Sequence, residues 1–180
     1  MPADFEAKGH GLQRLSVEIY RGLVFATFSD STPSLSDYLG PEMRERLDRF
    51  HKPIVYLGCT RQYARANWKL YAENVRDPYH ASLLHPFLST FNLQRASTHV
   101  ENLIDERGLN SCIMIYHTED ASGGAAYKDA KITSFKENLR LEDMSILTNI
   151  KEFDDKANFQ IQSIFPQLVV QQVLNSLVTR

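Results

Sequence analysis

The sequence has few cysteines, and neither of them lies in a motif typical of metal clusters. Cys59 and Cys112 are its two cysteines, and neither belongs to a CxxC or CxH arrangement. An iron–sulfur cluster or a zinc ribbon needs about four closely grouped ligands that are rich in cysteine. We therefore expect no such cluster in this chain, and two buried or unreactive thiols rather than a disulfide.

The chain also lacks an excess of one charge and a long apolar run. It has 20 Lys and Arg against 22 Asp and Glu, for a net charge of −2, so no basic field predicts a nucleic-acid partner. No stretch approaches the roughly 20 apolar residues that span a membrane. The N-terminal sequence MPADFEAKGHG has no apolar core typical of a signal peptide. We therefore predict a cytoplasmic protein without nucleic-acid or membrane partners.

The composition is that of an ordinary globular domain. Of the 180 residues, 43% are hydrophobic and 23% are charged, which argues against disorder. This length suits one domain with a sizeable core, so we predict a single domain over residues 1–180. The segments described next predict an α+β fold class: a mostly antiparallel sheet with packed helices.

The first half of the chain contains both strand and helix patterns. Residues 12–29 predict a β-hairpin that turns at Arg21 and Gly22. Residues 34–50 predict a helix that is capped by Ser34 and interrupted near Pro41. Further segments follow: a strand over 53–65, helix over 67–85 with a break at Pro78, two strands within 99–117, and a loop over 119–131.

The last third of the chain reads mainly as strands. Residues 145–153 and 158–164 alternate in polarity and flank a turn at 154–157, which predicts a hairpin. Residues 167–179 predict one strand, or two strands with a turn. Because the pattern runs to Arg180 without a closing turn, we expect a fold that is truncated at the C-terminus.

The segment most suggestive of chemistry is 67–86, NWKLYAENVRDPYHASLLHP. His80 and His85 are five residues apart, and imidazole is a common ligand of Zn, Fe, Cu and Ni. In a regular helix, that spacing separates the two side chains by roughly 140°. A π-bulge, or a break at Pro78, is therefore needed to bring them together. On spacing alone, a pair of surface histidines is the simpler interpretation. Some apolar side chains of this segment are expected in the core: Trp68, Leu70, Tyr71, Leu83 and Leu84.

The longer pattern NWK…EN..D.YH….H resembles the iron-binding signature of one enzyme family. That family is the Rieske non-haem iron aromatic-ring-hydroxylating oxygenases, and the resemblance is to the catalytic domain of the large (α) subunit. The flanking strings YRGLVFATFS, SLSDYLG and IFPQLVVQQVLNSLVTR are similar too, and ENVRDPYHASLLH looks closest to the salicylate and anthranilate branch. The matching positions of the signature are Asn67, Trp68, Lys69, Glu73, Asn74, Asp77, Tyr79, His80 and His85.

The resemblance implies a role for several residues. His80 and His85 would be the two histidines of a 2-His-1-carboxylate site for mononuclear Fe(II). Asp77 would orient the imidazole and link it to a Rieske cluster in a neighbouring subunit. Asn74 is expected either near the open iron position or in a structural role. Arg76 is expected at the surface, with pairing to a substrate carboxylate as the alternative.

The resemblance also implies cofactors, partners and a fold. Electrons would come from NAD(P)H through a reductase or ferredoxin and a [2Fe-2S] Rieske cluster. The substrates would be O2 and an aromatic carboxylate, in aromatic hydrocarbon catabolism. A small (β) subunit and a homotrimer are family expectations. The implied fold is the helix-grip type of START and Bet v 1 proteins.

Two departures from the family pattern stand out. The CxH and CxxH motif of the Rieske cluster is absent, and nothing downstream matches the third iron ligand, since Asp154 and Asp155 lie in a predicted turn. We therefore expect a partial catalytic domain that is inactive by itself. Two alternatives stay open: a non-enzymatic START-like module that binds a hydrophobic or aromatic ligand, and a zinc hydrolase with Glu73 as a ligand.

Overall fold

The computed structural model describes residues 11–85, 99–116, 142, 152–153, 157–173 and 176–180. Within these residues it contains a two-stranded and a five-stranded antiparallel sheet, together with three helices. The elements are β1 (Ser16–Tyr20), β2 (Leu23–Thr27), α1 (Leu35–Asp48), α2 (Trp68–Asn74), α3 (Ala81–Leu84), β3 (Val100–Ile104), β4 (Ser111–Tyr116), β5 (Ala157–Ile164), β6 (Leu168–Val173) and β7 (Ser176–Thr179).

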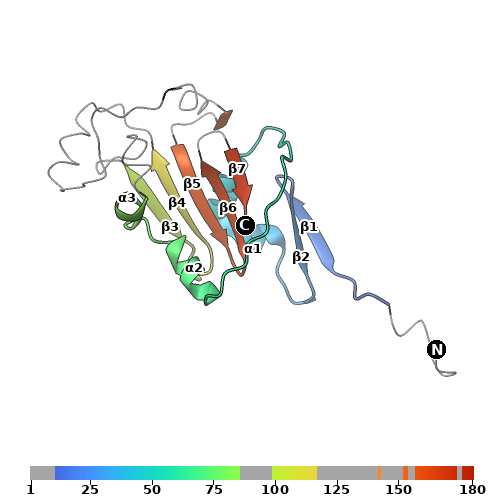
Figure 1. The fold of residues 1–180 in the computed structure, drawn as a ribbon. Coiled ribbons are helices and arrows are strands. Elements are labelled where there is room, and N and C mark those ends of the chain that lie inside the picture. The colour runs from blue at the N-terminus through green and yellow to red at the C-terminus, as the bar shows by residue number, and fades with distance from the viewer. Residues whose placement is uncertain (1–10, 86–98, 117–141, 143–151, 154–156, 174–175) are drawn as a thin grey trace.

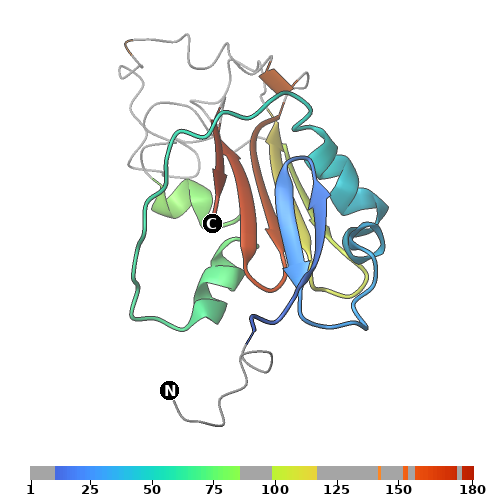
Figure 2. The same ribbon diagram turned by 90° about the vertical axis from the view of Figure 1, so that its right-hand side faces the viewer.

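The five-stranded sheet is a meander, in which β3 to β7 pair in the order of the sequence. Helix α1 lies behind it in Figure 1. The quarter turn in Figure 2 shows α1 on one face of this sheet and α2 and α3 on the other. The predicted α+β class with a mostly antiparallel sheet is therefore confirmed. No helix among the described residues is long and apolar enough to cross a membrane.

The main core lies between α1 and the five-stranded sheet. One stripe of α1, whose successive members are four positions apart, is buried because that spacing keeps side chains on one face of a helix. Burying each such side chain stabilises the fold by roughly 1.5–3 kcal/mol. The helix contributes Leu35, Leu39, Met43 and Leu47, and the sheet contributes Cys112, Met114, Ala157, Ile164 and Val170.

Local sequence determines where α1 begins and bends. Ser34 is the N-cap, and its Oγ accepts a hydrogen bond from the Asp37 N–H at 3.1 Å. Gly40 has a φ of 72°, a conformation that glycine adopts without steric cost, and Pro41 follows it. Both the predicted cap and the predicted interruption are confirmed.

The β1–β2 hairpin is attached to both ends of α1. Glu18 accepts a hydrogen bond from the Leu35 N–H, and Asp48 accepts hydrogen bonds from Tyr20 and Arg21. Partial burial raises the pKa of the Asp48 carboxyl, but the hydrogen bonds from Arg21 and Tyr20 outweigh it, so the pKa lies below its ordinary value.

The hairpin is confirmed, with Arg21 and Gly22 as its turn at φ of 49° and 80°. The apolar residues that alternate with polar ones in β1 do not form a buried face, however, because Val17 and Ile19 are exposed within the described structure. The face that contacts the α1 core carries Tyr20, Leu23 and Phe25 instead.

Three glutamines of β5 and β6 are fully buried, and two of them face α1. Gln162 Nε2 donates to the Met43 carbonyl at 2.8 Å, and Gln160 Nε2 donates to the Arg46 carbonyl at 3.3 Å. The third, Gln172, donates to the Ala157 carbonyl. Each of the three buried amide groups therefore donates a hydrogen bond, which offsets part of the penalty of burying a polar group.

Not every predicted element is present. Residues 53–65 form no strand, and they are exposed. A segment with the composition of a strand becomes one only when it pairs with a neighbouring strand, and 53–65 pair with none in the described structure. Residues 67–85 do form two helices around Pro78, and 99–116 contain β3 and β4, as predicted.

Near the C-terminus, Glu152 and Phe153 lie in a 3₁₀ turn rather than in the predicted strand over 145–153. The loop over 119–131, residues 145–151 and the predicted turn residues Asp154 and Asp155 fall outside the described residues. The predicted strand over 158–164 is present within β5. Residues 167–179 contain two antiparallel strands, β6 and β7, so of the two predicted alternatives the structure shows two strands rather than one.

Candidate metal centre

The predicted ligands lie in residues 67–85, called the site segment below. Asn67 caps α2, and its Oδ1 accepts a hydrogen bond from the Lys69 N–H at 3.1 Å. The helix ends at Asn74, and a second short helix begins after His80 and ends before His85. Pro78 lies in the break between the two helices. Of the two alternatives, the structure shows the break, and no π-helix occurs in this segment.

Asp77 is fixed by contacts within its own loop. Its Oδ1 accepts a hydrogen bond from the Tyr79 N–H at 2.8 Å, and its Oδ2 lies 3.2 Å from His80 Nδ1. The His80 side chain is only 16% exposed, whereas that of Asp77 is 46% exposed. One carboxylate therefore holds both the loop and the imidazole ring.

These contacts determine which nitrogen of His80 can bind a metal. A carboxylate only accepts hydrogen bonds, so Nδ1 of a neutral His80 must carry the proton. His80 Nε2 then carries the lone pair that can bind a metal ion. The Asn74 amide nitrogen lies 3.2 Å from this atom and can donate to it, so a metal ion bound here would take the place of that hydrogen bond. The arrangement is the one by which outer carboxylates orient metal-binding histidines.

The second histidine lies next to the first. The ring centroids of His80 and His85 are 5.2 Å apart, and the planes are inclined by 66°. A metal ion binds ring nitrogen at about 2.0–2.1 Å, so two rings at this separation are close enough to share one ion. The donor set of two imidazoles, one of them oriented by a carboxylate, suits a first-row transition metal.

The third ligand of such a site is not found in the described part of the chain. Within it, no group of three or more His, Cys, Asp or Glu side chains could hold a metal ion. Glu73 lies on α2 and is exposed, and it does not complete such a group with the histidines. His80 and His85 are thus brought together without a third ligand among these residues.

The aromatic and aliphatic side chains of α2 are more exposed than predicted. Trp68 is 57% exposed and Leu70 is 66% exposed, and Tyr71 and Tyr79 are exposed as well. The prediction that Trp68, Leu70, Tyr71 and Leu84 are core residues is therefore wrong for the described structure, since Leu84 is exposed too. The side chain of Leu83 falls outside the described part. Helical spacing shows which side chains share a face, but not whether another element covers that face.

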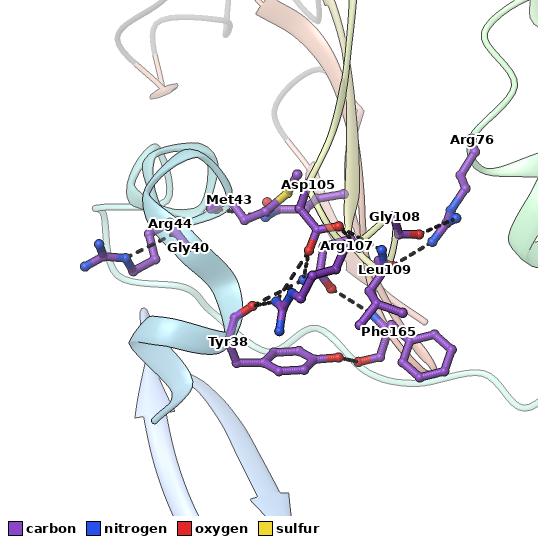
Figure 3. A network of polar contacts seen from close by, with 12 residues as sticks. Tyr38, Gly40, Met43, Arg44, Arg76, Asp105, Arg107, Gly108, Leu109 and Phe165 are labelled. Atoms are coloured by element: carbon purple, nitrogen blue, oxygen red, sulfur yellow. Dashed lines mark hydrogen bonds and ion pairs between the residues drawn. The ribbon is translucent and has the colours of Figure 1, made fainter. Parts of the chain in front are cut away.

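Arg76 makes contacts that the sequence does not reveal. Its Nη1 donates to the Gly108 carbonyl at 3.1 Å, and its Nη2 donates to the Leu109 carbonyl at 2.6 Å. Both acceptors lie in residues 105–110, called the β3–β4 turn below (Figure 3). The side chain is partly buried and bonded to this turn, a contact that the predicted surface position does not include.

Comparison with known proteins identifies relatives of the whole chain. The large subunit of anthranilate 1,2-dioxygenase from Burkholderia cepacia is 56% identical over 182 residues, which is 100% of this chain and 43% of that protein. Terephthalate 1,2-dioxygenase, terminal oxygenase component subunit alpha 2, from Comamonas sp. is 44% identical, covering 100% of this chain and 44% of that protein. The large oxygenase component of salicylate 5-hydroxylase from Ralstonia sp. is 34% identical, with 100% and 43% covered.

The chain thus spans less than half the length of these relatives, which are large subunits of enzymes that oxidise aromatic rings. A family profile agrees with them: that of the ring hydroxylating alpha subunit (catalytic domain) matches residues 45–179. The resemblance seen in the sequence is confirmed. This chain belongs to the family of ring-hydroxylating oxygenase large subunits, and it matches the catalytic domain of that family.

Proposed function

We propose that the chain supplies two iron ligands to the catalytic domain of a large subunit that hydroxylates an aromatic acid with Fe(II) and O2. The observation that carries this proposal is the placement of His80 beside His85, with His80 Nδ1 hydrogen-bonded to the Asp77 carboxylate. In a member of this family, that arrangement is best explained as two thirds of a 2-His-1-carboxylate site.

Each polar side chain has a part in this arrangement. Asp77 holds the proton on His80 Nδ1 and makes Nε2 a stronger ligand, because a carboxylate raises the basicity of the imidazole that donates to it. The Asn74 amide nitrogen lies 3.2 Å from the same Nε2, at the metal-binding side of the ring, and its hydrogen bond would give way to the metal ion. His85 contributes the second imidazole.

Fe(II) in such a site supplies the activation of dioxygen, while the protein binds and orients the substrate. The third ligand and the source of electrons are expected beyond the residues described. We propose that a Rieske [2Fe-2S] cluster, fed by NAD(P)H through a reductase or ferredoxin, provides the electrons, and that the chain alone is inactive. A small subunit, a trimeric assembly, the helix-grip form of the fold and a cytoplasmic location remain predictions.

The substrate class follows from the relatives. Anthranilate, terephthalate and salicylate all combine an aromatic ring with a carboxylate, and each stands in the name of a relative that covers this chain. We infer an aromatic carboxylic acid as the substrate.

The ligand assignment can be tested by anaerobic calorimetry of Fe(II) binding to the wild-type chain and to His80→Ala and His85→Ala. Removing one ligand of a weak site should lower the affinity by at least about tenfold. His51→Ala, which changes a histidine that follows α1, is the matched control and should leave the affinity unchanged. Equal affinity in all four proteins would show that these histidines are not ligands.

A ligand-binding module would give a different result. An aromatic acid would then raise the melting temperature equally with and without a chelator, by linkage of binding to folding. Stoichiometric zinc with esterase activity would instead support the hydrolase.

A further inference from the structure

We propose that Arg76 is a positioning residue of the metal site, which fixes Asp77 and His80 relative to the sheet through the β3–β4 turn. This proposal rests on the proposed function, because it assigns Arg76 a role in the geometry of that site. Arg76 precedes Asp77 directly, so any shift of its backbone moves the carboxylate that orients His80.

The contact between Arg76 and the turn is suited to fixing a position. The guanidinium donates to two successive carbonyls, of Gly108 and Leu109, and its planar fork makes such paired bonds directional. Hydrogen bonds from a charged donor are also roughly twice as strong as neutral ones. With both terminal nitrogens bonded to backbone, the side chain is arranged for anchoring rather than for pairing with a substrate carboxylate.

The turn that accepts these bonds is itself well braced. Asp105 Oδ1 accepts from the Leu109 and Asn110 N–H groups at 2.7 and 3.0 Å, and Asp105 Oδ2 accepts from the Asn110 side chain at 2.9 Å. Gly108 has a φ of 69°, which other residues rarely adopt. The two carbonyls that bind Arg76 are therefore held in place by the turn's own hydrogen bonds.

The β3–β4 turn is also joined to α1 and to the β5–β6 connection. Arg107 lies 4.9 Å from the centre of the Tyr38 ring and donates to the Tyr38 carbonyl. The Tyr38 hydroxyl donates to the Phe165 carbonyl at 2.8 Å, and Asn110 Oδ1 accepts from the Phe165 N–H at 3.0 Å. Figure 3 shows these contacts converging beside the turn, with Arg76 reaching it from the other side.

Few other contacts hold the C-terminal end of α2 within the described structure. Trp68, Leu70 and Tyr71 are exposed, and Val75 is the buried apolar residue next to Arg76. The hydrogen bond from His80 Nδ1 to Asp77 Oδ2 is 3.2 Å long, so a shift of about 1 Å would break it. We infer that Val75 and Arg76 together set the position of the site.

The test compares Arg76→Gln and Arg76→Lys with Arg44→Gln, using Co(II) as a spectroscopic probe. Arg44 is a matched control, because its Nε also donates to a backbone carbonyl, that of Gly40 at 3.2 Å, but on α1. Affinity and the visible absorption of bound Co(II) report on the site. Hydrogen exchange over residues 70–80 without metal reports on the anchor.

For Arg76→Gln, we expect a Co(II) affinity lower by about three- to tenfold, which is at or below the low end of losses for outer residues of metal sites. The Co(II) spectrum should change, and exchange over 70–80 should become faster. Arg76→Lys should fall between wild type and Arg76→Gln, because lysine retains the charge without the fork. Arg44→Gln should match wild type in all three measurements.

Unchanged affinity and spectrum in Arg76→Gln would overturn the proposal, and so would faster exchange alone, since that result shows a structural anchor only. An equal loss in Arg44→Gln would overturn it as well. If Arg76→Gln does not fold, Arg76→Lys decides by the same criteria. His80→Ala is measured in parallel: if it binds Co(II) as tightly as wild type, the proposed metal site itself has failed, whatever the Arg76 variants show.

Discussion

The α1 core and the site segment are held in place in opposite ways. Leu39, Met43 and Leu47 are almost completely buried against the sheet, whereas the apolar side chains of α2 remain largely exposed in the described structure. Apolar burial stabilises the first region, and a few directional polar contacts position the second. Substitutions in the core should therefore alter stability, and substitutions in the site segment should alter binding.

The largest expected effect comes from the same substitution made in each region. Leu47→Ala removes a fully buried side chain and should lower the free energy of unfolding by about 2–5 kcal/mol. Leu70→Ala, at a position that is 66% exposed, should change it by less than about 0.5 kcal/mol. Urea unfolding of both variants measures the difference. A similar loss in the two variants would mean that Leu70 is buried in the protein in solution.

The next effect concerns binding rather than stability. Asp77→Ala removes the acceptor of His80 Nδ1 and should weaken metal binding by about 10–100-fold, with little change in the melting temperature. Glu73→Ala removes the same charge from the same segment without breaking that contact. Calorimetry with Fe(II) should show a small change for Glu73→Ala. Equal losses would point to the net charge of the segment, or to Glu73 as a ligand.

Removing the N-cap of α1 or of α2 compares the two regions again, with a smaller expected change in stability. Ser34→Ala removes the cap of α1 and should lower the global stability by about 1 kcal/mol. Asn67→Ala removes the cap of α2, where helix opening need not require global unfolding. We expect faster hydrogen exchange over 68–74 with nearly constant global stability. A global loss as large as that of Ser34→Ala would show that α2 unfolds together with the core.

The last effect is a pH dependence that belongs to the core. Burial, together with the hydrogen bond to Glu101, raises the pKa of Tyr116 to about 12. The folded state disfavours the phenolate, so this stabilisation is present below pH 10 and is lost as the pH rises toward 12.

Stability measured from pH 9 to 12 should therefore fall less steeply in Tyr116→Phe than in wild type. The thiol of Cys112, whose pKa burial also raises to about 12, should account for part of the remaining fall. Identical slopes for wild type and Tyr116→Phe would contradict this role of the tyrosine.

The sequence predicted those features that depend on neighbouring residues. The turn at Arg21 and Gly22, the cap at Ser34 and the break at Pro78 all arise from local backbone preferences, and all are present. The matched pattern around His80 and His85 also placed the two rings in one segment, where they lie side by side.

Features that depend on distant partners were not predictable in the same way. Arg76 bonds to carbonyls 32 and 33 positions further along the chain, and no local pattern reports such a contact. Residues 53–65 have the composition of a strand but no paired neighbour. The buried Gln160 and Gln162 have polar side chains that normally indicate exposure, and only the carbonyls of α1 explain their place.

Those two glutamines also determine how α1 can move. Apolar contacts alone allow a helix to slide or rotate on a sheet at little cost, but Gln162 and Gln160 each select one carbonyl, of Met43 and Arg46. A slip by one residue would leave buried amides without acceptors, at about 1–3 kcal/mol each. The helix therefore has a single translational register, and through Tyr38 this register extends to the β3–β4 turn. Strand β5 thus fixes the position of α1, and the contacts of α1 with the β3–β4 turn and of the turn with Arg76 link β5 to His80, some eighty residues earlier in the chain.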